Sequence, residues 1–255
     1  MTIGRPRVFL LPGIFGDEPP LADFRAALDD RLDFELLDYP DIDGPSDEIR
    51  DFDRIVGSAL ERIRSLRPTG DVHIAGYSFG GLVGFVTARR LQEEGRRVGL
   101  LALLDSRALS LKVPRSGGLM RNRDAAPGLW GAAGDAASRL LIATGLSEVV
   151  RASVGPIGKM FGAGASRGVR RLLVQNLRGR SLSSVTLGHF DGPLVLFRAQ
   201  KQPEPGLPSD LGWSAHCAAV RTVPVHGDHN SMFQADHLAA NADLIWSEIE
   251  GRIGG

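Results

Sequence analysis

The chain of 255 residues has no net charge, a single cysteine and no long hydrophobic run. Its 30 Lys and Arg balance its 30 Asp and Glu, so the chain lacks the overall positive charge that is typical of nucleic-acid-binding proteins. The single cysteine, Cys217, excludes an internal disulfide framework and suits a reducing compartment. No acid–base motif surrounds Cys217, and we expect a packed thiol.

Apolar runs such as Val98–Leu104 fall well short of the length of a membrane span. The first residues, Met1–Pro6, lead directly into a strand pattern without the apolar core or cleavage site of a signal peptide. We therefore expect a cytoplasmic protein that has no membrane partner and binds no nucleic acid. Nothing in the sequence indicates a metal site or a redox cofactor.

With 43% hydrophobic and 24% charged residues, the composition is that of a globular protein. Short apolar runs typical of buried strands lie at Arg7–Leu11, Phe34–Leu37, Asp71–Ala75, Val98–Leu104, Gly192–Gln200 and Arg221–Val225. Apolar residues at helical spacing lie between or after them, at Pro20–Leu32, Ser46–Ile63, Leu82–Arg90 and Ala235–Ile249. This alternation predicts an α/β fold, a mostly parallel sheet with helices on both faces.

The alternation stops between about residues 106 and 190, where small residues are frequent. Two helical patterns stand out in this segment, roughly Ala136–Val150 and Arg167–Leu177. Because the strand rhythm resumes afterwards, we interpret about 106–190 as a helical lid inserted into a single domain of residues 1–255.

Charge is unevenly distributed between this segment and the start of the chain. Residues 106–190 hold 13 basic and 3 acidic residues, a balance of +10, whereas residues 1–78 hold 9 basic and 16 acidic residues, a balance of −7. A basic lid favours an acidic partner or a phosphate-bearing substrate. An arginine-rich face that is merely solvated explains the charge equally well.

The stretch Gly76–Gly81 reads Gly-Tyr-Ser-Phe-Gly-Gly and lies between a predicted strand and a predicted helix. This context is typical of a nucleophile elbow, the sharp turn that presents a catalytic serine. We expect Ser78 to have a strained backbone conformation and a Cβ at Gly76 or Gly80 to clash with its neighbours. A glycine-rich turn with an incidental serine is the alternative, but the flanking strand and helix favour the elbow.

A serine nucleophile needs a base, and in elbow enzymes the order along the chain is serine, acid, histidine. His229 follows the last predicted strand, in a loop that Gly227 allows to turn tightly. We predict that His229 is the base. His226 is the weaker candidate, because it lies closer to the strand and suits a packing role.

Two carboxylates compete for the role of orienting the histidine. Asp105 ends the strand after the elbow helix, 27 positions beyond Ser78, at the sheet edge where α/β proteins place their sites. The alternative, Asp210, lies in a proline-rich loop after the later strand, the part of the fold where many α/β hydrolases carry their acid. We favour Asp105 and expect Asp228 to shape the loop next to His229.

Two backbone amides are predicted to form an oxyanion hole. One is the N–H of Phe79, the residue after Ser78, at the start of the predicted helix. The other is the N–H of Ile14, which follows Pro12-Gly13 in the loop after the first strand.

The Gly76–Gly81 motif, Asp105 and the Gly-Asp-His of Gly227–His229 together resemble the thioesterase domains of nonribosomal peptide and polyketide synthetases, members of the α/β-hydrolase superfamily. Leu196–Ala199 and Asp210–Trp213 are also similar to that family, and the resemblance covers nearly the whole chain outside the predicted lid. The place of Asp105 makes the chain more similar to the product-releasing type than to the editing type.

The resemblance implies an α/β-hydrolase fold without a cofactor of its own. It implies an acyl, peptidyl or polyketide substrate carried as a phosphopantetheine thioester on a carrier protein. Ser78 would form an acyl-enzyme, and hydrolysis or cyclisation would release the chain. The carrier, covalently attached or supplied in trans, and coenzyme A remain open as the acyl donor.

Two other classes of function compete with this interpretation. One is a carboxylesterase or lactonase that acts on small oxyesters with the same three residues. The other is a non-catalytic binding module built on the same fold. The presence of Ser78, Asp105 and His229 argues against a binding module, which needs none of them.

Overall fold

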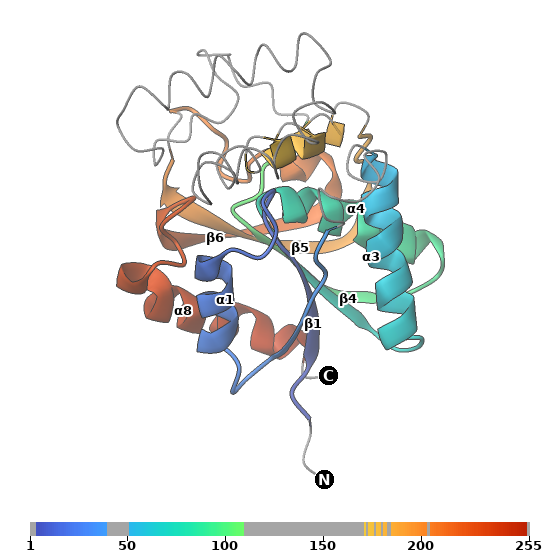
Figure 1. Ribbon diagram of the computed structural model, residues 1–255, viewed down its shortest axis with the longest axis horizontal. Helices are drawn as coiled ribbons and strands as arrows, with labels where there is room; N and C mark the ends of the chain where they lie inside the picture. Colours follow the sequence, from blue (N-terminus) through green and yellow to red (C-terminus); the bar gives the residue numbers. More distant parts are fainter. Residues whose placement is uncertain are drawn as a thin grey trace, which may run out of the picture. The chain divides into compact units, whose positions relative to one another are not determined.

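The computed structural model describes residues 4–39, 51–109, 185–202 and 205–253, with most positions between 171 and 182 (Figure 1). The chain divides into two compact units, one made of Met1–Tyr39, Asp53–Leu111 and Thr186–Gly255, the other of Pro40–Phe52 and Lys112–Val185. The predicted lid overlaps the second unit. Its expected helix at Ala136–Val150 lies outside the described residues, as do most of the expected helix at Arg167–Leu177 and the helix start expected at Ser46. The lid therefore stays a prediction.

The first unit is built on a six-stranded sheet in the order β2-β1-β3-β4-β5-β6, and every neighbouring pair is parallel. Its strands are β1 (Arg7–Leu11), β2 (Asp33–Leu36), β3 (Val72–Tyr77), β4 (Val98–Leu104), β5 (Phe190–Lys201) and β6 (Cys217–Asp228). Each strand that the sequence predicts is present. Because all strands run the same way, their carboxyl ends lie at one edge.

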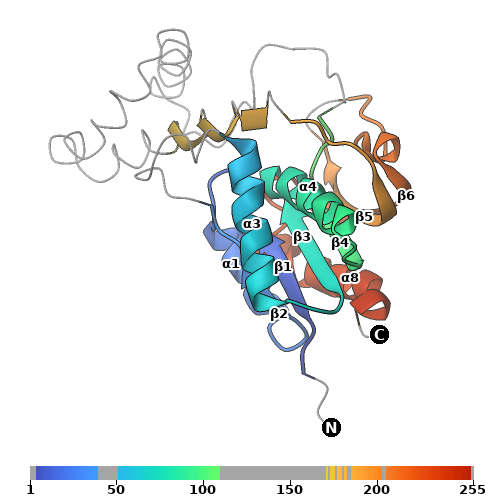
Figure 2. The ribbon, with the colours of Figure 1, turned by 90° about the vertical axis from the view of Figure 1, so that its right-hand side faces the viewer.

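Helices cover both faces of this sheet, as predicted (Figures 1 and 2). They are α1 (Pro19–Ala27), α3 (Phe52–Leu66), α4 (Phe79–Glu93) and α8 (Ala235–Ile253). Helices α1 and α8 pack on one face, α4 packs on the other, and α3 lies beside α4. Ion pairs of Arg90 with Asp53 and of Arg64 with Glu94 join α3 to α4.

The ends of several elements differ from the prediction, and the contacts of α1 and β6 explain two of the differences. Helix α1 ends at Ala27, five residues early, yet Leu28 and Leu32 stay in the core through a turn in which the N–H of Leu32 donates to the carbonyl of Leu28 at 2.8 Å. Strand β6 begins at Cys217 because this residue pairs with Phe190 of β5. Tertiary pairing of this kind overrides the local pattern.

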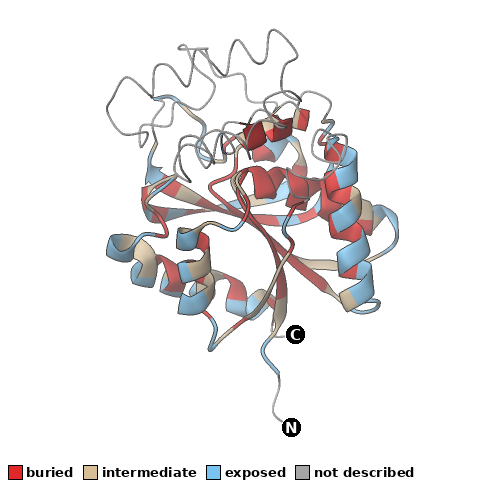
Figure 3. Ribbon diagram, in the orientation of Figure 1, coloured by how far each residue is buried: buried red, intermediate tan, exposed pale blue. Residues whose placement is uncertain are grey.

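The core lies between the sheet and its helices, and Figure 3 shows buried residues along the strands and the inner faces of the helices. Phe24 of α1 contacts Phe233 with ring centroids 4.5 Å apart. On the α4 face, Phe85 contacts the fully buried Trp213 at 4.8 Å. Full burial of a large apolar side chain contributes about 1.5–3 kcal/mol. Cys217 is a free, buried thiol, as predicted, and burial raises its pKa.

No helix within the described ranges combines the length and the apolar character that crossing a bilayer requires.

Candidate active site

The backbone at Ser78 forms the sharp turn that the motif predicts. Strand β3 ends at Tyr77 and α4 begins at Phe79, so Ser78 alone joins them. Its φ of 55° and ψ of −115° lie in a region that non-glycine residues rarely adopt, at a cost of about 1–3 kcal/mol. The Ser78 N–H donates to the carbonyl of Leu104 at 3.1 Å, and the Ser106 hydroxyl donates to the carbonyl of Ser78 at 2.7 Å. These bonds hold the strained turn.

Two glycines of the elbow allow the backbone to approach closely. A Cβ on Gly76 would lie 2.3 Å from the carbonyl oxygen of Gly80, and a Cβ on Gly80 would lie 2.2 Å from that of Leu11 and 2.3 Å from that of Pro12. Both obstacles are backbone atoms, which a side-chain rotation cannot move away. The clash expected from the sequence is confirmed.

Gly80→Ala is expected to lower the free energy of unfolding by about 3 kcal/mol, because the new methyl overlaps the backbone of Leu11 and Pro12. Urea unfolding followed by circular dichroism measures the change. Gly57→Ala is the matched control, since a Cβ there meets nothing within 4 Å, and it should stabilise α3 by about 0.5–1 kcal/mol. An unfolding curve of Gly80→Ala that matches wild type would contradict the clash.

The predicted nucleophile, base and acid lie within hydrogen-bond distance of one another. His229 Nε2 is 3.0 Å from Ser78 Oγ, and His229 Nδ1 is 2.9 Å from Asp105 Oδ2. A carboxylate only accepts hydrogen bonds, so Nδ1 carries the imidazole proton and Nε2 accepts from the serine hydroxyl. The Asp105 side chain is 4% exposed and that of His229 is 32% exposed. Asp105 is therefore shielded from water, while His229 stays accessible.

The acid is held by the neighbouring strand. The Asp105 N–H donates to the carbonyl of Phe197 at 2.7 Å, and Asp105 Oδ1 accepts from the N–H of Ala199 at 2.9 Å. The φ of Asp105 is 47°, in the left-handed region, which aspartate tolerates better than most residues. Next to it, the carbonyl of Ser106 accepts from the indole N–H of Trp213 at 2.7 Å.

Asp210, the alternative candidate for the acid, forms hydrogen bonds within its own loop. The carboxylate of Asp210 accepts hydrogen bonds from the backbone N–H groups of Gly212 at 3.1 Å and Ser214 at 2.9 Å. Burial pushes the pKa of Asp210 up, but the hydrogen bonds from Ser214 and Gly212 outweigh it and hold that pKa below its usual value. The carboxylate bonded to His229 is that of Asp105.

Strand β6 runs to Asp228, so Gly227 and Asp228 belong to the strand and not to the loop that the sequence predicts after Val225. His226 lies near the end of β6, but its side chain is exposed, so the packing role expected of it is wrong. Gly227 has a φ of 87°, which favours glycine. Asp228 accepts from both the N–H and the hydroxyl of Ser231 at 2.9 Å. Burial alone would raise the pKa of Asp228, but the bonds from Ser231 lower it overall.

Comparison with known proteins places this chain in a family. Residues 6–249 match the model of the family described as "Thioesterase domain". The chain belongs to the thioesterase domain family. This membership confirms the predicted resemblance and the predicted enzyme class, a serine hydrolase of thioesters.

Solved structures and sequence relatives agree with the fold. The covalent complex of the NocB thioesterase domain with a fluorophosphonate nocardicin G analog superposes with a TM-score of 0.66 and 21% identity, covering 99% of this chain and 96% of that one. A four-domain nonribosomal peptide synthetase, holo-AB3403, gives a TM-score of 0.71 and 18% identity over 97% of this chain and 19% of that one. The non-reducing polyketide synthase crz7 of Cladonia metacorallifera is 31% identical over 103 residues, 40% of this chain and 5% of that one. The chain thus spans only a small part of the curated relatives that it matches.

Three residues of this thioesterase domain contact the candidate triad without any signal in the sequence. The Tyr77 hydroxyl donates to the carbonyl of His229 at 2.6 Å, and the two rings stack with centroids 5.1 Å apart and planes 19° apart. Burial raises the pKa of Tyr77, which keeps the phenol protonated. Ser106 contacts the elbow as described above, and Gln202 contacts Asp105. Tyr77 occupies a variable position of the motif, so no pattern could identify it.

The two predicted oxyanion donors lie on neighbouring segments. Phe79 is the first residue of α4, and Ile14 lies in the turn after β1, the strand next to β3. The Tyr39 hydroxyl fixes this turn by donating to the carbonyl of Pro12 at 2.7 Å. Their role as oxyanion donors to a substrate bound at Ser78 stays a prediction.

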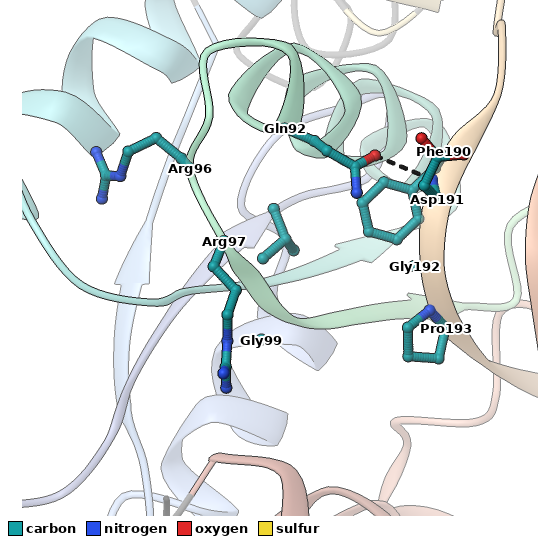
Figure 4. Close-up of a pocket in the computed structure, with 9 residues that line it drawn as sticks. Gln92, Arg96, Arg97, Gly99, Phe190, Asp191, Gly192 and Pro193 are labelled. Carbon is teal, nitrogen blue, oxygen red and sulfur yellow. Dashed lines mark hydrogen bonds between the residues drawn. The ribbon is translucent and has the colours of Figure 1, made fainter.

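A surface pocket of about 330 Å³ lies away from this site, where β4 and β5 begin (Figure 4). It is lined by Gln92, Arg96, Arg97, Val98, Gly99, Phe190, Asp191, Gly192 and Pro193. The side-chain oxygen of Gln92 accepts from the N–H of Asp191 at 2.9 Å. Because Ser78 and Asp105 follow the opposite ends of their strands, this pocket is separate from the candidate triad.

Proposed function

We propose that this thioesterase domain releases an acyl, peptidyl or polyketide chain from the phosphopantetheine thioester of a carrier protein, through an acyl-enzyme on Ser78. The observation that carries the proposal is the continuous hydrogen-bond chain from Ser78 through His229 to Asp105 in a member of the thioesterase domain family.

In the first step Ser78 Oγ attacks the thioester carbonyl carbon while its proton moves to His229 Nε2. The imidazolium that forms is stabilised by the carboxylate of Asp105 on Nδ1. Collapse of the tetrahedral intermediate breaks the C–S bond, and His229 returns the proton to the departing pantetheine sulfur. The acyl group is then an ester of Ser78.

The tetrahedral oxyanion needs donors that are already in place. The N–H of Phe79 at the start of α4 and the N–H of Ile14 after β1 are our candidates, and the field of the α4 N-terminus acts in the same direction. Loss of one such donor typically lowers kcat about 10²–10³-fold.

In the second step His229 removes a proton from the incoming nucleophile. The nucleophile attacks the carbonyl carbon of the Ser78 ester, the bond between that carbon and Ser78 Oγ breaks, and His229 returns the proton to Oγ. Water as the nucleophile gives a free acid, and a hydroxyl or amine of the acyl chain gives a cyclic product. The side-chain exposure of His229, 32%, leaves room for such a nucleophile to approach the base.

A carrier protein is the partner that we propose. The named relatives include a polyketide synthase and a four-domain nonribosomal peptide synthetase. The positive balance of residues 106–190 suits an acidic partner or the phosphate of a pantetheine arm.

The test is turnover of an acyl-pantetheine thioester beside its matched oxyester, and of the same acyl group on a carrier protein and on coenzyme A. We expect kcat/KM for the thioester to exceed that for the oxyester at least about tenfold, a difference of about 1.4 kcal/mol in activation free energy. Preference for the oxyester would instead assign the domain to the esterases or lactonases. Preference for coenzyme A over the carrier protein would replace the proposed partner. No turnover of any substrate would favour a binding module.

A further inference from the structure

The two oxygens of the Asp105 carboxylate have different partners. Oδ2 accepts from Nδ1 of His229 at 2.9 Å. Oδ1 accepts from the N–H of Ala199 at 2.9 Å and from the side-chain amide nitrogen of Gln202 at 3.1 Å. One oxygen of the carboxylate therefore bonds His229, and the other bonds residues at the end of β5.

The orientation of the Gln202 amide is fixed by its partners. Its Nε2 contacts both Oδ1 of Asp105 and the carbonyl oxygen of Ala199, the latter at 2.8 Å. Both partners are acceptors, and only the amide nitrogen can donate to them. If the amide were flipped, its oxygen would face Oδ1 of Asp105 and the carbonyl oxygen of Ala199, and no hydrogen bond could form. The amide therefore has one satisfactory orientation.

We propose that Gln202 is a positioning residue, which acts on the base by fixing the carboxylate of Asp105. This inference rests on the proposed function, in which Asp105 orients His229. Two N–H donors on Oδ1 set the plane of the carboxylate, so that Oδ2 faces His229. The N–H of Ala199 fixes Oδ1 from the strand, and the amide of Gln202 adds the second donor.

The residue type suits this task. Gln202 follows the last residue of β5, Lys201, in the part of the fold where many α/β hydrolases carry their acid. A neutral amide there donates to Asp105 without adding charge. A second carboxylate at the same distance would repel that of Asp105, and the pair would tend to hold a proton between them. With Gln202 at the end of β5, Asp105 at the end of β4 gains a hydrogen-bond donor and no repelling charge.

The first experiment is the steady-state kinetics of Gln202→Met, which keeps the length of the side chain and removes its donor. Hydrogen bonds to charged groups are strong enough that we expect kcat to fall at least about tenfold. KM should stay within about twofold, because Gln202 acts on the base and not on ground-state binding. A wild-type kcat would overturn the proposal.

A double-mutant cycle separates positioning through Asp105 from a general structural role. When the side chain of Asp105 is already removed in Asp105→Ala, adding Gln202→Met should change kcat less than about twofold, since the carboxylate that Gln202 positions is gone. Multiplied losses in the double variant would overturn the proposal, because independent structural damage adds in free energy. Gln92→Met is the matched control. It removes another hydrogen-bonded glutamine, at the opposite edge of the sheet, and should leave kcat unchanged (Figure 4).

The rate of Ser78 modification by a fluorophosphonate probe gives a second readout that needs no thioester. The probe should modify Gln202→Met more slowly than wild type, and Gln202→Glu, which keeps the chain length, should also react slowly. Thermal melts show whether Gln202→Met and Gln202→Glu are folded, and if one is not, the labelling rate of the other tests the proposal. Labelling of wild type that persists in Ser78→Ala would refute the proposed function itself. Ser78-dependent labelling at an unchanged rate in Gln202→Met would refute only the positioning role.

Discussion

Ser78→Ala is expected to lower kcat for an acyl-pantetheine thioester by about 10⁴-fold or more, because it removes the hydroxyl that we propose forms the acyl-enzyme. Ser78 Oγ is the atom that His229 Nε2 contacts, at 3.0 Å. Removing the oxygen leaves the base and the acid in place without a nucleophile to activate. Release of free thiol, followed spectrophotometrically, measures the loss, and residual activity within a hundredfold of wild type would refute the assignment of the nucleophile.

Ser78→Gly is the control that shows whether the loss of activity in Ser78→Ala comes from a change in folding. Alanine keeps a Cβ at a φ of 55°, so Ser78→Ala should retain the strain of the turn. Glycine adopts positive φ without a steric penalty, and Ser78→Gly should therefore be equally inactive yet more stable than Ser78→Ala by about 1 kcal/mol. Urea unfolding of the two variants tests this. Equal stability would mean that the turn relaxes without its side chain.

The three candidate triad residues could be identified from the sequence because each follows a strand of a parallel sheet. The sheet collects the carboxyl ends of β3, β4 and β6 at one edge, so local patterns far apart in the sequence imply proximity in space. The place of His226 closer to the strand favoured His229 as the base, and the strand-end position favoured Asp105 over Asp210. In the structure His229 Nδ1 lies 2.9 Å from Asp105 Oδ2, and the roles of the three residues stay a proposal.

The contacts around the triad could not be predicted in the same way. Tyr77 and His229 are 152 positions apart, and Gln202 and Asp105 are 97 apart. Their contacts depend on side-chain direction at the sheet edge and on the register of β5, which one sequence does not encode in any local pattern. No motif in the sequence marks Gln202. Its hydrogen bonds show that the position is used.

Asp105→Asn is expected to lower kcat by about 10³–10⁴-fold, a larger loss than the removal of one charge near a base would cause. The reason lies in the two donors on Oδ1. The N–H of Ala199 and the amide nitrogen of Gln202 require an acceptor at that position. The new side-chain oxygen should therefore take the place of Oδ1, and its NH₂ group should face His229.

An NH₂ group next to Nδ1 reverses the tautomer of His229. Nδ1 then has to accept a hydrogen bond, Nε2 carries the proton, and the Ser78 hydroxyl loses its acceptor. The Nε2–H tautomer should be visible in the nitrogen chemical shifts of the labelled imidazole, beside the kinetic loss. The matched control is Asp210→Asn. Asp210 bonds only the nearby N–H groups of Gly212 and Ser214 among the contacts described above, so kcat should stay within about twofold of wild type. The opposite result, a large loss in Asp210→Asn with Asp105→Asn near wild type, would move the acid to the end of β5.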